Sequence, residues 1–417
     1  MFGKNKVDTL VVGAGPVGLF AGAALAHRGF ETMIVDSQWR TASRSYALAL
    51  HPRTIDLLHQ VGLGGEIEES GNRIDTLAFF EGGKRVGELR YGDLPAAHPY
   101  LLILPQEAME RMLEARLKAA GVKVLWNHRL ASFEVEGDRV RAQVDRLIKE
   151  SSGYGFAETS WVVGRSLDIR AHWLLGADGS RSLVRRQLGI GFEEVAASDL
   201  FAVFEFDTAG LAIPEVRVIL DEGAMGVLWP LGGGRYRWSF QVESISDPER
   251  EREKSRVAVV VDDRQFPHLG VEQLKRLIRE RAPWFEAQLG EIRWSLGVRF
   301  ERRLAESFAR PPLWLVGDSA HLAGPLGMHS MNVGIAEAAS LIEALAGHRE
   351  DGLELPLEHW AEERQKEWRK LLGLGAPPAA RPDAAAWAAK RASLLPGWIP
   401  ASGPDLEGLL GQVGVSL

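Results

Sequence analysis

The 417-residue sequence contains no cysteine, which excludes disulfide bonds, thiolate metal sites, a catalytic thiol and any cofactor attached through cysteine. It therefore gives no sign of an oxidising compartment, and we expect a cytoplasmic protein. Eleven histidines are present, but they form no paired spacing such as HExxH. From this pattern we expect no metal site.

An excess of basic residues is also missing. The net charge is −7, so the chain lacks the positive charge that neutralises phosphates, and we expect no nucleic-acid partner. Long uninterrupted apolar runs are absent as well. The charge-free stretch from Thr9 to Ala26 follows Lys4 and Lys6 as in an export signal, but four glycines and Pro16 interrupt it. We therefore expect neither a membrane span nor a cleaved signal.

The glycines of this stretch have a specific spacing. "DTLVVGAGPVGLFAGAALAHRG" indicates a short apolar strand, a turn with Gly13-x-Gly15-x-x-Gly18, and a helix that ends at Gly29. In a dinucleotide-binding unit the first glycine permits the turn and the second admits a pyrophosphate, while the third lets helix and strand pack closely. The next apolar strand ends in Asp36, 23 residues after Gly13, where a carboxylate accepts hydrogen bonds from a ribose.

The chain is long for a single core, and its texture changes along its length. We expect an α/β nucleotide domain from residues 1–190 and 301–346, with a hairpin near 74–104 that turns at Gly82 and Gly83 and contributes to the substrate side. Residues 191–300 are rich in strand-like segments and predict an inserted sheet domain. Residues 347–417 predict a helical tail with one exposed helix and an Ala/Pro-rich segment, ordered or loose.

Two further motifs follow the glycine turn. "GADGSRSLVRRQLG" contains a DGxxSxxR pattern at Asp178, Gly179, Ser182 and Arg185. "LVGDSAHLAGPLGMHSMNVGIAEAASLIEAL" contains GDxAH, a later proline and MNxGI. In this order the motifs resemble the FAD-dependent aromatic hydroxylases, the group A flavoprotein monooxygenases of the para-hydroxybenzoate hydroxylase and polyketide hydroxylase type, over roughly residues 7–370.

The resemblance implies a glutathione-reductase-type FAD-binding Rossmann domain interleaved with an antiparallel-sheet substrate domain. It also implies non-covalent FAD. Asp318 follows an apolar strand, where its carboxylate suits a ribityl hydroxyl and favours FAD over NAD. The expected cofactor-binding residues are Gly13, Gly15, Pro16, Val17, Gly18, Asp36, Arg44, Gln106, Leu130, Asp178, Asp318, Pro325, Gly327, Met328, His329 and Asn332.

Three of these residues have alternative interpretations. Arg44 also suits a surface cation, Gln106 a residue that only begins its helix, and Asp318 a helix N-cap. The loop after Pro325 departs from the family pattern PxGGQGMN, since Met328 and Ser330 replace two glycines. Side chains at these positions disfavour positive φ, so we expect altered flavin geometry.

His329 is the histidine that we expect beside the flavin ring, and the sequence leaves open whether it is a catalytic base or a hydrogen-bonding partner of the loop. The resemblance implies that NADPH or NADH reduces FAD, that O2 then forms C4a-hydroperoxyflavin, and that an aromatic or polycyclic molecule is hydroxylated or epoxidised. Such chemistry belongs to the cofactor and needs no protein nucleophile. The chain lacks a second GxGxxG for the nicotinamide, and Arg44, Arg181 and Arg185 are candidates for its phosphates.

A flavin reductase, a halogenase and a non-catalytic flavoprotein binder remain alternatives, although the halogenase motif WxWxIP is absent. The expected partner is a small aromatic molecule, and the chain is a monomer or a homodimer. Arg217, Arg235 and Arg237 suit either a substrate carboxylate or the surface, and we favour a bulky, neutral polycyclic phenol. Strand alternation does not assign a ligand-facing side to Phe204, Phe206, Val218, Leu220, Leu228, Trp229, Tyr236, Trp238 and Phe240.

Overall fold

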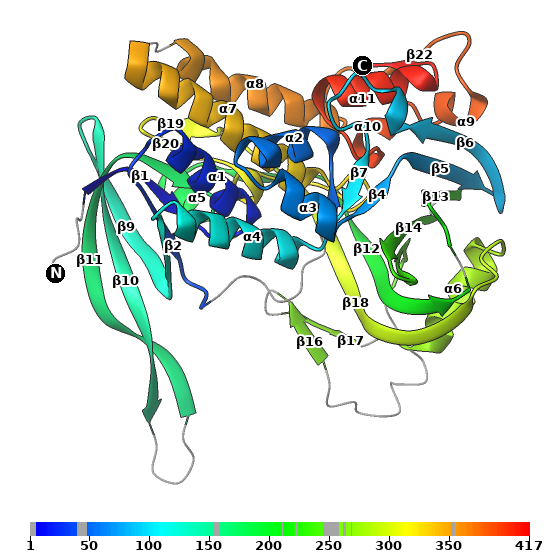
Figure 1. Cartoon of the computed structure of the whole chain (residues 1–417), viewed down its shortest axis with the longest axis horizontal. Coiled ribbons are helices and arrows are strands. Elements are labelled where there is room, and N and C mark those ends of the chain that lie inside the picture. The colour runs from blue at the N-terminus through cyan, green and yellow to red at the C-terminus, as the bar shows by residue number, and fades with distance from the viewer. Residues whose placement is uncertain are drawn as a thin grey trace.

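The computed structural model describes residues 6–39, 48–152, 158–210, 212–221, 224–244, 258–261, 264–267, 269–351 and 355–417. Its elements are arranged around two large sheets (Figure 1). The path of the first sheet is β19 (Ala309–Arg310), β20 (Leu313–Leu315), β11 (Glu158–Gly176), β1 (Lys6–Val12), β2 (Thr32–Asp36) and β8 (Lys123–Trp126). All neighbours from β20 to β8 pair in parallel, as in a nucleotide-binding domain.

Helices cover this parallel sheet. The predicted glycine-turn helix is α1 (Pro16–His27), and it packs against α4 (Gln106–Ala119) and α7 (His329–Asp351). Leu10 and Val11 of β1 are fully buried in the same core as Leu19 and Leu25 of α1. The apolar end of β1, Leu10 to Val12, is thus explained by burial on both faces of the sheet.

An antiparallel extension is attached to the first sheet. β9 (His128–Glu136) pairs with β10 (Arg139–Ser152), and β10 pairs along its whole length with β11. Since β9 ends its pairing at Arg146, the remaining part of β10 and β11 continues as a two-stranded arm (Figure 1).

The second sheet is mainly antiparallel. Its order is β21 (His321–Leu322), β18 (Gln288–Ala305), β12 (Phe192–Ala209), β15 (Arg235–Gln241), β14 (Ala224–Gly232), β13 (Val216–Asp221), β5 (Thr76–Glu81) and β6 (Lys84–Arg90). The hairpin of β5 and β6 turns at Gly82 and Gly83, as predicted, and joins the sheet through a parallel pair with β13. With β18 reaching Ala305, the sheet extends beyond the interval 191–300.

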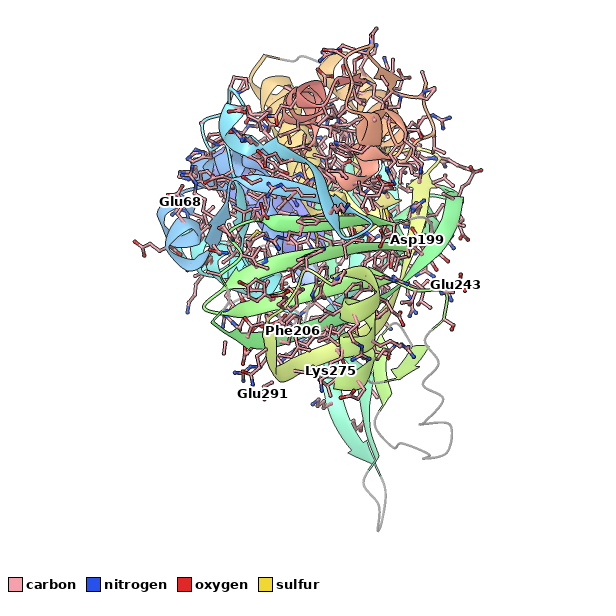
Figure 2. The ribbon with its side chains drawn as sticks, turned by 90° about the vertical axis from the view of Figure 1, so that its right-hand side faces the viewer. Glu68, Asp199, Phe206, Glu243, Lys275 and Glu291 are labelled. Carbon is pink, nitrogen blue, oxygen red and sulfur yellow. The ribbon has the colours of Figure 1, made fainter. Side chains whose placement is uncertain are left out.

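The structure assigns the two faces of this sheet. Helix α6 (Val271–Arg281) covers one face, and Figure 2 shows it, with Lys275, lying over the sheet near Phe206. The aromatic and aliphatic side chains packed on that side are Phe204, Phe206, Leu228, Tyr236, Trp238 and Phe240. Val218, Leu220 and Trp229 point the other way and join the main core, which also contains β1 and α1. The second group therefore faces the nucleotide domain.

Short elements connect the two sheets. A three-stranded sheet has the order β3 (Ala49–Leu50), β7 (Leu101–Ile103) and β4 (Asn72–Ile74). Helices α2 (Pro52–Gln60) and α3 (Gly64–Ser70) follow β3, and α5 (Leu183–Gln187) follows β11. β16 (Ala258–Val261) and β17 (Arg264–Pro267) form a separate two-stranded sheet, in which β17 contacts β18 of the second large sheet.

The C-terminal region is packed into the main core. It contains α8 (Leu355–Leu371), β22 (Ala379–Ala380), α9 (Ala386–Ala389), α10 (Leu395–Trp398), α11 (Gly403–Gln412) and β23 (Val415–Ser416). The prediction of an exposed helix is wrong, because Trp360 and Trp368 of α8 are buried. After α8 the Trp387 ring stacks on Phe79 with 4.4 Å between centroids, so the Ala/Pro-rich segment is ordered against β5. Within the described part of the chain, no helix is both long and apolar enough to cross a membrane.

Candidate cofactor site

The three glycines of the first turn have three different surroundings. A Cβ atom on Gly13, which has φ +107°, would lie 2.1 Å from the carbonyl oxygen of Ala177. A Cβ atom on Gly18 would lie 2.0 Å from the carbonyl oxygen of Gly13. Both contacts exclude any side chain. Gly15, by contrast, has ordinary backbone angles and no atom within 4 Å of a Cβ position.

The space above Gly15 lies at the start of a helix. Gly15 is the N-cap of α1, Pro16 opens the helix, and no side chain caps it. The first backbone N–H groups of a helix attract anions, because they lack partners and lie at the positive end of the helix dipole. This place therefore fits a pyrophosphate, as the second glycine of the motif predicts.

A cavity of about 880 Å³ extends from this turn to the second sheet. The predicted cofactor residues that line it are Gly15, Pro16, Val17, Gln106, Asp318, Pro325, Met328 and His329. Val298 and Phe300 of β18 line the same cavity, so both large sheets contribute to its wall. The predicted residues outside its lining are Gly13, Gly18, Asp36, Leu130, Asp178, Gly327 and Asn332. Arg44 lies outside the described residues.

Asp36 holds the glycine turn from the end of β2. One carboxylate oxygen accepts a hydrogen bond from the backbone N–H of Ala14 at 2.6 Å, and the other accepts one from Gln38 at 2.7 Å. Leu130 is buried on β9 opposite Val144. Neither residue reaches the cavity, and both lie near the strand ends where the adenosine end of a dinucleotide is expected.

The DGxxSxxR motif stabilises the fold around the cavity. The Asp178 carboxylate accepts hydrogen bonds from the Ser182 hydroxyl at 2.6 Å and from the backbone N–H of Leu183 at 2.7 Å, which fixes the start of α5. Burial raises the pKa of Asp178. Arg185 donates to the carbonyl oxygens of Ser319 at 2.7 Å and Ser180 at 2.8 Å. This guanidinium thus joins two turns, and since Arg185 also lines the cavity, its role as a receptor for nicotinamide phosphates stays a prediction.

Asp318 is exposed between two buried neighbours, Gly317 and Ser319, and its side chain lines the cavity. The preceding Gly317 has φ +63° and lies close to Gly334 of α7, where a Cβ atom would be 2.9 Å from the Gly317 Cα. Since α7 begins only at His329, Asp318 is not its N-cap, and that alternative is wrong. Its position at the end of β20 suits a hydroxyl-bearing ligand.

A buried network that the sequence did not predict lies behind this turn. One Glu337 oxygen accepts hydrogen bonds from the backbone N–H of Gly317 at 3.2 Å and from His321 Nε2 at 2.8 Å. The Trp368 indole N–H donates to the other Glu337 oxygen, and the Trp368 ring stacks on His321 with 3.7 Å between centroids. His321 and Glu337 are fully buried. In the sequence, this network was indicated only by His321 of the GDxAH motif and Glu337 of GIAEAA.

Hydrogen bonds from His51 and Asn332 hold the loop after Pro325 in place. His51 Nε2 donates to the carbonyl oxygen of Gly327 at 2.8 Å, and the Asn332 amide donates to Met328 O at 2.7 Å and to Ala49 O at 2.9 Å. Burial holds the pKa of His51 well below its ordinary value. Met328 adopts φ +50°, a left-handed conformation that favours glycine. A methionine side chain therefore occupies a backbone conformation that glycine adopts more freely.

His329 is almost completely buried at the beginning of α7, and its Nε2 donates to the carbonyl oxygen of Ala401 at 3.1 Å. Burial lowers the pKa of His329 to about 4, so the ring is neutral at neutral pH. A ring with so low a pKa is a weak proton acceptor at neutral pH. The geometry thus favours the hydrogen-bonding interpretation over the catalytic base.

Comparison with known proteins identifies the family. Residues 6–372 match the family described as FAD binding domain. The chain belongs to this FAD-binding family. Its fold is similar to p-nitrophenol 4-monooxygenase from Pseudomonas putida DLL-E4, with a TM-score of 0.70, 20% identity, and coverage of 98% of this chain and 94% of that chain. This similarity confirms the predicted fold class.

Two relatives have a higher sequence identity to this chain. The 6-methylpretetramide 4-monooxygenase of Streptomyces rimosus is 28% identical over 366 residues, which are 86% of this chain and 59% of that protein. Pentachlorophenol 4-monooxygenase of Sphingobium chlorophenolicum is 24% identical over 339 residues, 80% of this chain and 56% of that protein. The chain thus spans less than two thirds of the length of these relatives.

FAD is the cofactor of this family, and the residues present fit it. The open position at Gly15 and the uncapped start of α1 suit the pyrophosphate, while the exposed Asp318 carboxylate suits a polyol. The cavity between them is walled by the loop from Pro325 to Met331. The open space at Gly15, the uncapped start of α1 and the Asp318 carboxylate therefore all fit bound FAD.

Proposed function

We propose that this protein is an FAD-dependent monooxygenase that uses NADPH or NADH and O2 to hydroxylate an aromatic or polycyclic small molecule. The observation that carries the proposal is the shared cavity, in which the glycine turn and Asp318 of the nucleotide domain face Val298 and Phe300 of the second sheet. A cofactor held by the first set of residues would face a wall in which these two apolar side chains lie beside Arg299, Glu301 and Arg303 of the same strand. This is the arrangement needed to bring an apolar substrate to a bound flavin.

The protein's own part in the reaction is to bind, orient and exclude water. Bound FAD supplies electron transfer from the nicotinamide and activation of O2. The start of α1 holds the pyrophosphate, and Asp318 orients the ribityl chain. The N–H groups at the start of α7 lie at the positive end of its helix dipole and stabilise negative charge on the flavin ring. His329 is neutral at neutral pH and adds no charge to this wall.

A neutral substrate agrees with the charges of the second sheet. Arg237 is buried and pairs with Glu205 at 2.9 Å, and Arg217 pairs with Glu215 at 2.8 Å. Both guanidinium groups already have a carboxylate, so neither needs one from a ligand. The face toward the nucleotide domain carries Trp229 among aliphatic side chains. We infer a bulky, neutral phenol as the substrate class.

The nicotinamide co-substrate requires a separate contact. Arg181 lines the cavity beside the Asp178 turn and is our candidate for its phosphates. We assign Arg185 a structural role instead, because its guanidinium donates to two carbonyl oxygens. An Arg181→Ala variant is expected to raise the KM for NADPH or NADH without removing FAD.

The test is a reaction of the FAD-loaded protein with NADPH or NADH, isotopically labelled O2 and a panel of phenols and polycyclic phenols. We expect at least one compound to stimulate NAD(P)H oxidation and to gain one labelled oxygen atom, as measured by mass spectrometry. Asp318→Ala is the matched control for flavin dependence. NAD(P)H oxidation without labelled product would instead identify a reductase, and neither signal would identify a binder.

A further inference from the structure

Three potential metal ligands meet on the surface, away from the flavin cavity. His59 lies in the last turn of α2, Glu68 lies in α3, and His98 precedes β7. One ligand atom of each lies within 4.8 Å of the others. None of the three lines the cavity, and Figure 2 shows Glu68 at an edge of the molecule distant from Lys275 of α6.

The distances are those of a small coordination sphere. His59 Nε2 is 3.0 Å from Glu68 Oε1, and His98 Nε2 is 3.7 Å from the same oxygen. Zinc binds nitrogen and oxygen ligands at about 2.0–2.1 Å, so tetrahedral ligands lie about 3.4 Å from one another. The two observed distances lie on either side of that value. Because an imidazole lone pair lies in the plane of its ring, the stacked His59 and His98 rings must rotate apart before both nitrogens bind one ion.

A neighbouring carboxylate orients one of the histidines. His98 Nδ1 forms a short hydrogen bond with Asp56 Oδ1 of α2. Because a carboxylate oxygen accepts, Nδ1 is the donor, and Nε2 is the ring nitrogen on the side of Glu68. The same carboxylate–histidine pairing fixes the ligand tautomer in metal sites and strengthens the ligand.

Packing holds the two imidazoles together. Their rings are stacked with 4.0 Å between centroids and 25° between planes. Tyr100 donates to Glu68 Oε1 at 2.8 Å, which fixes the carboxylate between them. Arg73 lies over the Tyr100 ring, 4.2 Å from its centroid, and pairs with Asp75 at 2.9 Å. These contacts also describe a hydrogen-bond cluster without an ion, and the experiment below separates the two.

We propose that His59, Glu68 and His98 bind one Zn²⁺ ion, with water as the fourth ligand. All three side chains are partly exposed, which leaves room for that water. The ion connects α2, α3 and the segment before β7, so it stabilises the folded state by mass action. The residues come from three separate segments, which explains why the histidine spacing predicted no metal site.

The experiment is a calorimetric titration of the chelator-treated, FAD-loaded protein with zinc chloride. We expect one Zn²⁺ per chain and a rise in the thermal midpoint of unfolding. His59→Gln and His98→Gln should each weaken binding at least about tenfold, and Asp56→Asn about tenfold or more through the loss of orientation. His172→Gln is the matched control, because His172 pairs with Asp8 at 3.7 Å and belongs to no three-ligand group among the described residues. This variant should bind Zn²⁺ as the parent does.

Glu68→Gln tests the site without disturbing its packing. The amide oxygen still accepts the hydrogen bond from Tyr100, but the charge that attracts the ion is removed. We expect this variant to keep the parent's thermal midpoint in chelator and to lose most of the stabilisation by Zn²⁺. The proposal is overturned if the parent binds no Zn²⁺, or if the Glu68, His59 and His98 variants bind it as tightly as the parent.

Discussion

The carboxylate of Glu337 accepts a hydrogen bond from the backbone N–H of Gly317 at 3.2 Å. The contact comes from inside the protein and lies directly behind Asp318, whose side chain faces the cavity. Glu337 also accepts hydrogen bonds from His321 and Trp368, so both of its oxygens are used within this buried network. We infer that Glu337 positions the cavity-lining Asp318 without itself reaching the cavity.

Replacement of Glu337 by alanine should therefore destabilise the protein strongly. The change leaves the buried His321 and Trp368 donors without an acceptor, and each such unsatisfied donor costs about 1–3 kcal/mol of the free energy of unfolding. Flavin affinity should fall as well, since the Asp318 turn loosens. Glu343→Ala on the same helix is the control, because Glu343 is exposed and forms only a surface pair with Arg28. Equal denaturation midpoints for the two variants would refute this role.

Met328 offers a test of backbone strain. Its φ of +50° costs a residue with a Cβ about 1–2 kcal/mol, whereas glycine adopts this angle freely. Met328→Gly and Met328→Ala both remove the buried side chain, but only alanine keeps the strain. The glycine variant should be the more stable of the two by about 1 kcal/mol, allowing for the greater chain entropy of glycine. Urea denaturation of both proteins measures this difference, and a more stable alanine variant would show that the strain is absent.

Restoring both family glycines should change flavin reduction more than flavin binding. The Ser330 hydroxyl accepts a hydrogen bond from the backbone N–H of Ala323 at 3.2 Å, so Met328→Gly with Ser330→Gly frees both sides of the loop. FAD affinity rests mainly on the pyrophosphate, ribose and ribityl contacts and should move by less than about tenfold, or about 1.4 kcal/mol. Stopped-flow reduction by NAD(P)H and flavin titration measure the two effects. A collapse of affinity with an unchanged reduction rate would contradict this account.

His329 predicts a pH dependence of stability. Its pKa in the folded state is about 4, below its ordinary value of 6.5, so the unfolded chain binds more protons between these two pH values. Above pH 6.5 the free energy of unfolding is not reduced by His329. As the pH falls toward 4, protonation of the unfolded chain lowers the free energy of unfolding by about 3 kcal/mol. His329→Gln keeps a donor for Ala401 and should flatten this part of the curve. Thermal midpoints measured from pH 4 to pH 8 for both proteins are the check, and parallel curves would contradict the assignment.

The sequence predicted what is local along the chain. Gly13, Gly15 and Gly18 lie within one turn, and the chemistry of that turn follows from their spacing. Asp318 could be placed at the cavity because it directly follows an apolar strand. The hairpin at Gly82 and Gly83 was predicted for the same reason.

Contacts between distant segments could not be predicted. Asn332 meets the backbone of His51 across 281 positions, and neither residue carries a local pattern that indicates the other. The tail was predicted as a helical appendage, yet it reaches His329 through Ala401. Asp178 and Arg185 were identified as motif residues, but only the structure shows that their polar atoms hold turns together.

The sheet faces illustrate a different limit. Alternation along β14 and β15 separates Trp229 from Trp238, but the period of two is the same for either orientation of the strand. Only the position of α6 over Trp238 decides which side faces the nucleotide domain. The substrate side was therefore outside the reach of the sequence pattern.

The most direct test of the central claim is the flavin content of a Gly15→Val variant. The valine side chain meets no protein atom at its Cβ, so the fold should be retained while the space for the pyrophosphate is filled. Gly92→Val is the control, because Gly92 is equally unobstructed but lies outside the cavity lining. Absorbance spectra of the purified proteins should show bound flavin in the parent and in Gly92→Val, and almost none in a folded Gly15→Val. Full flavin occupancy in Gly15→Val would contradict the assignment of this cavity to FAD.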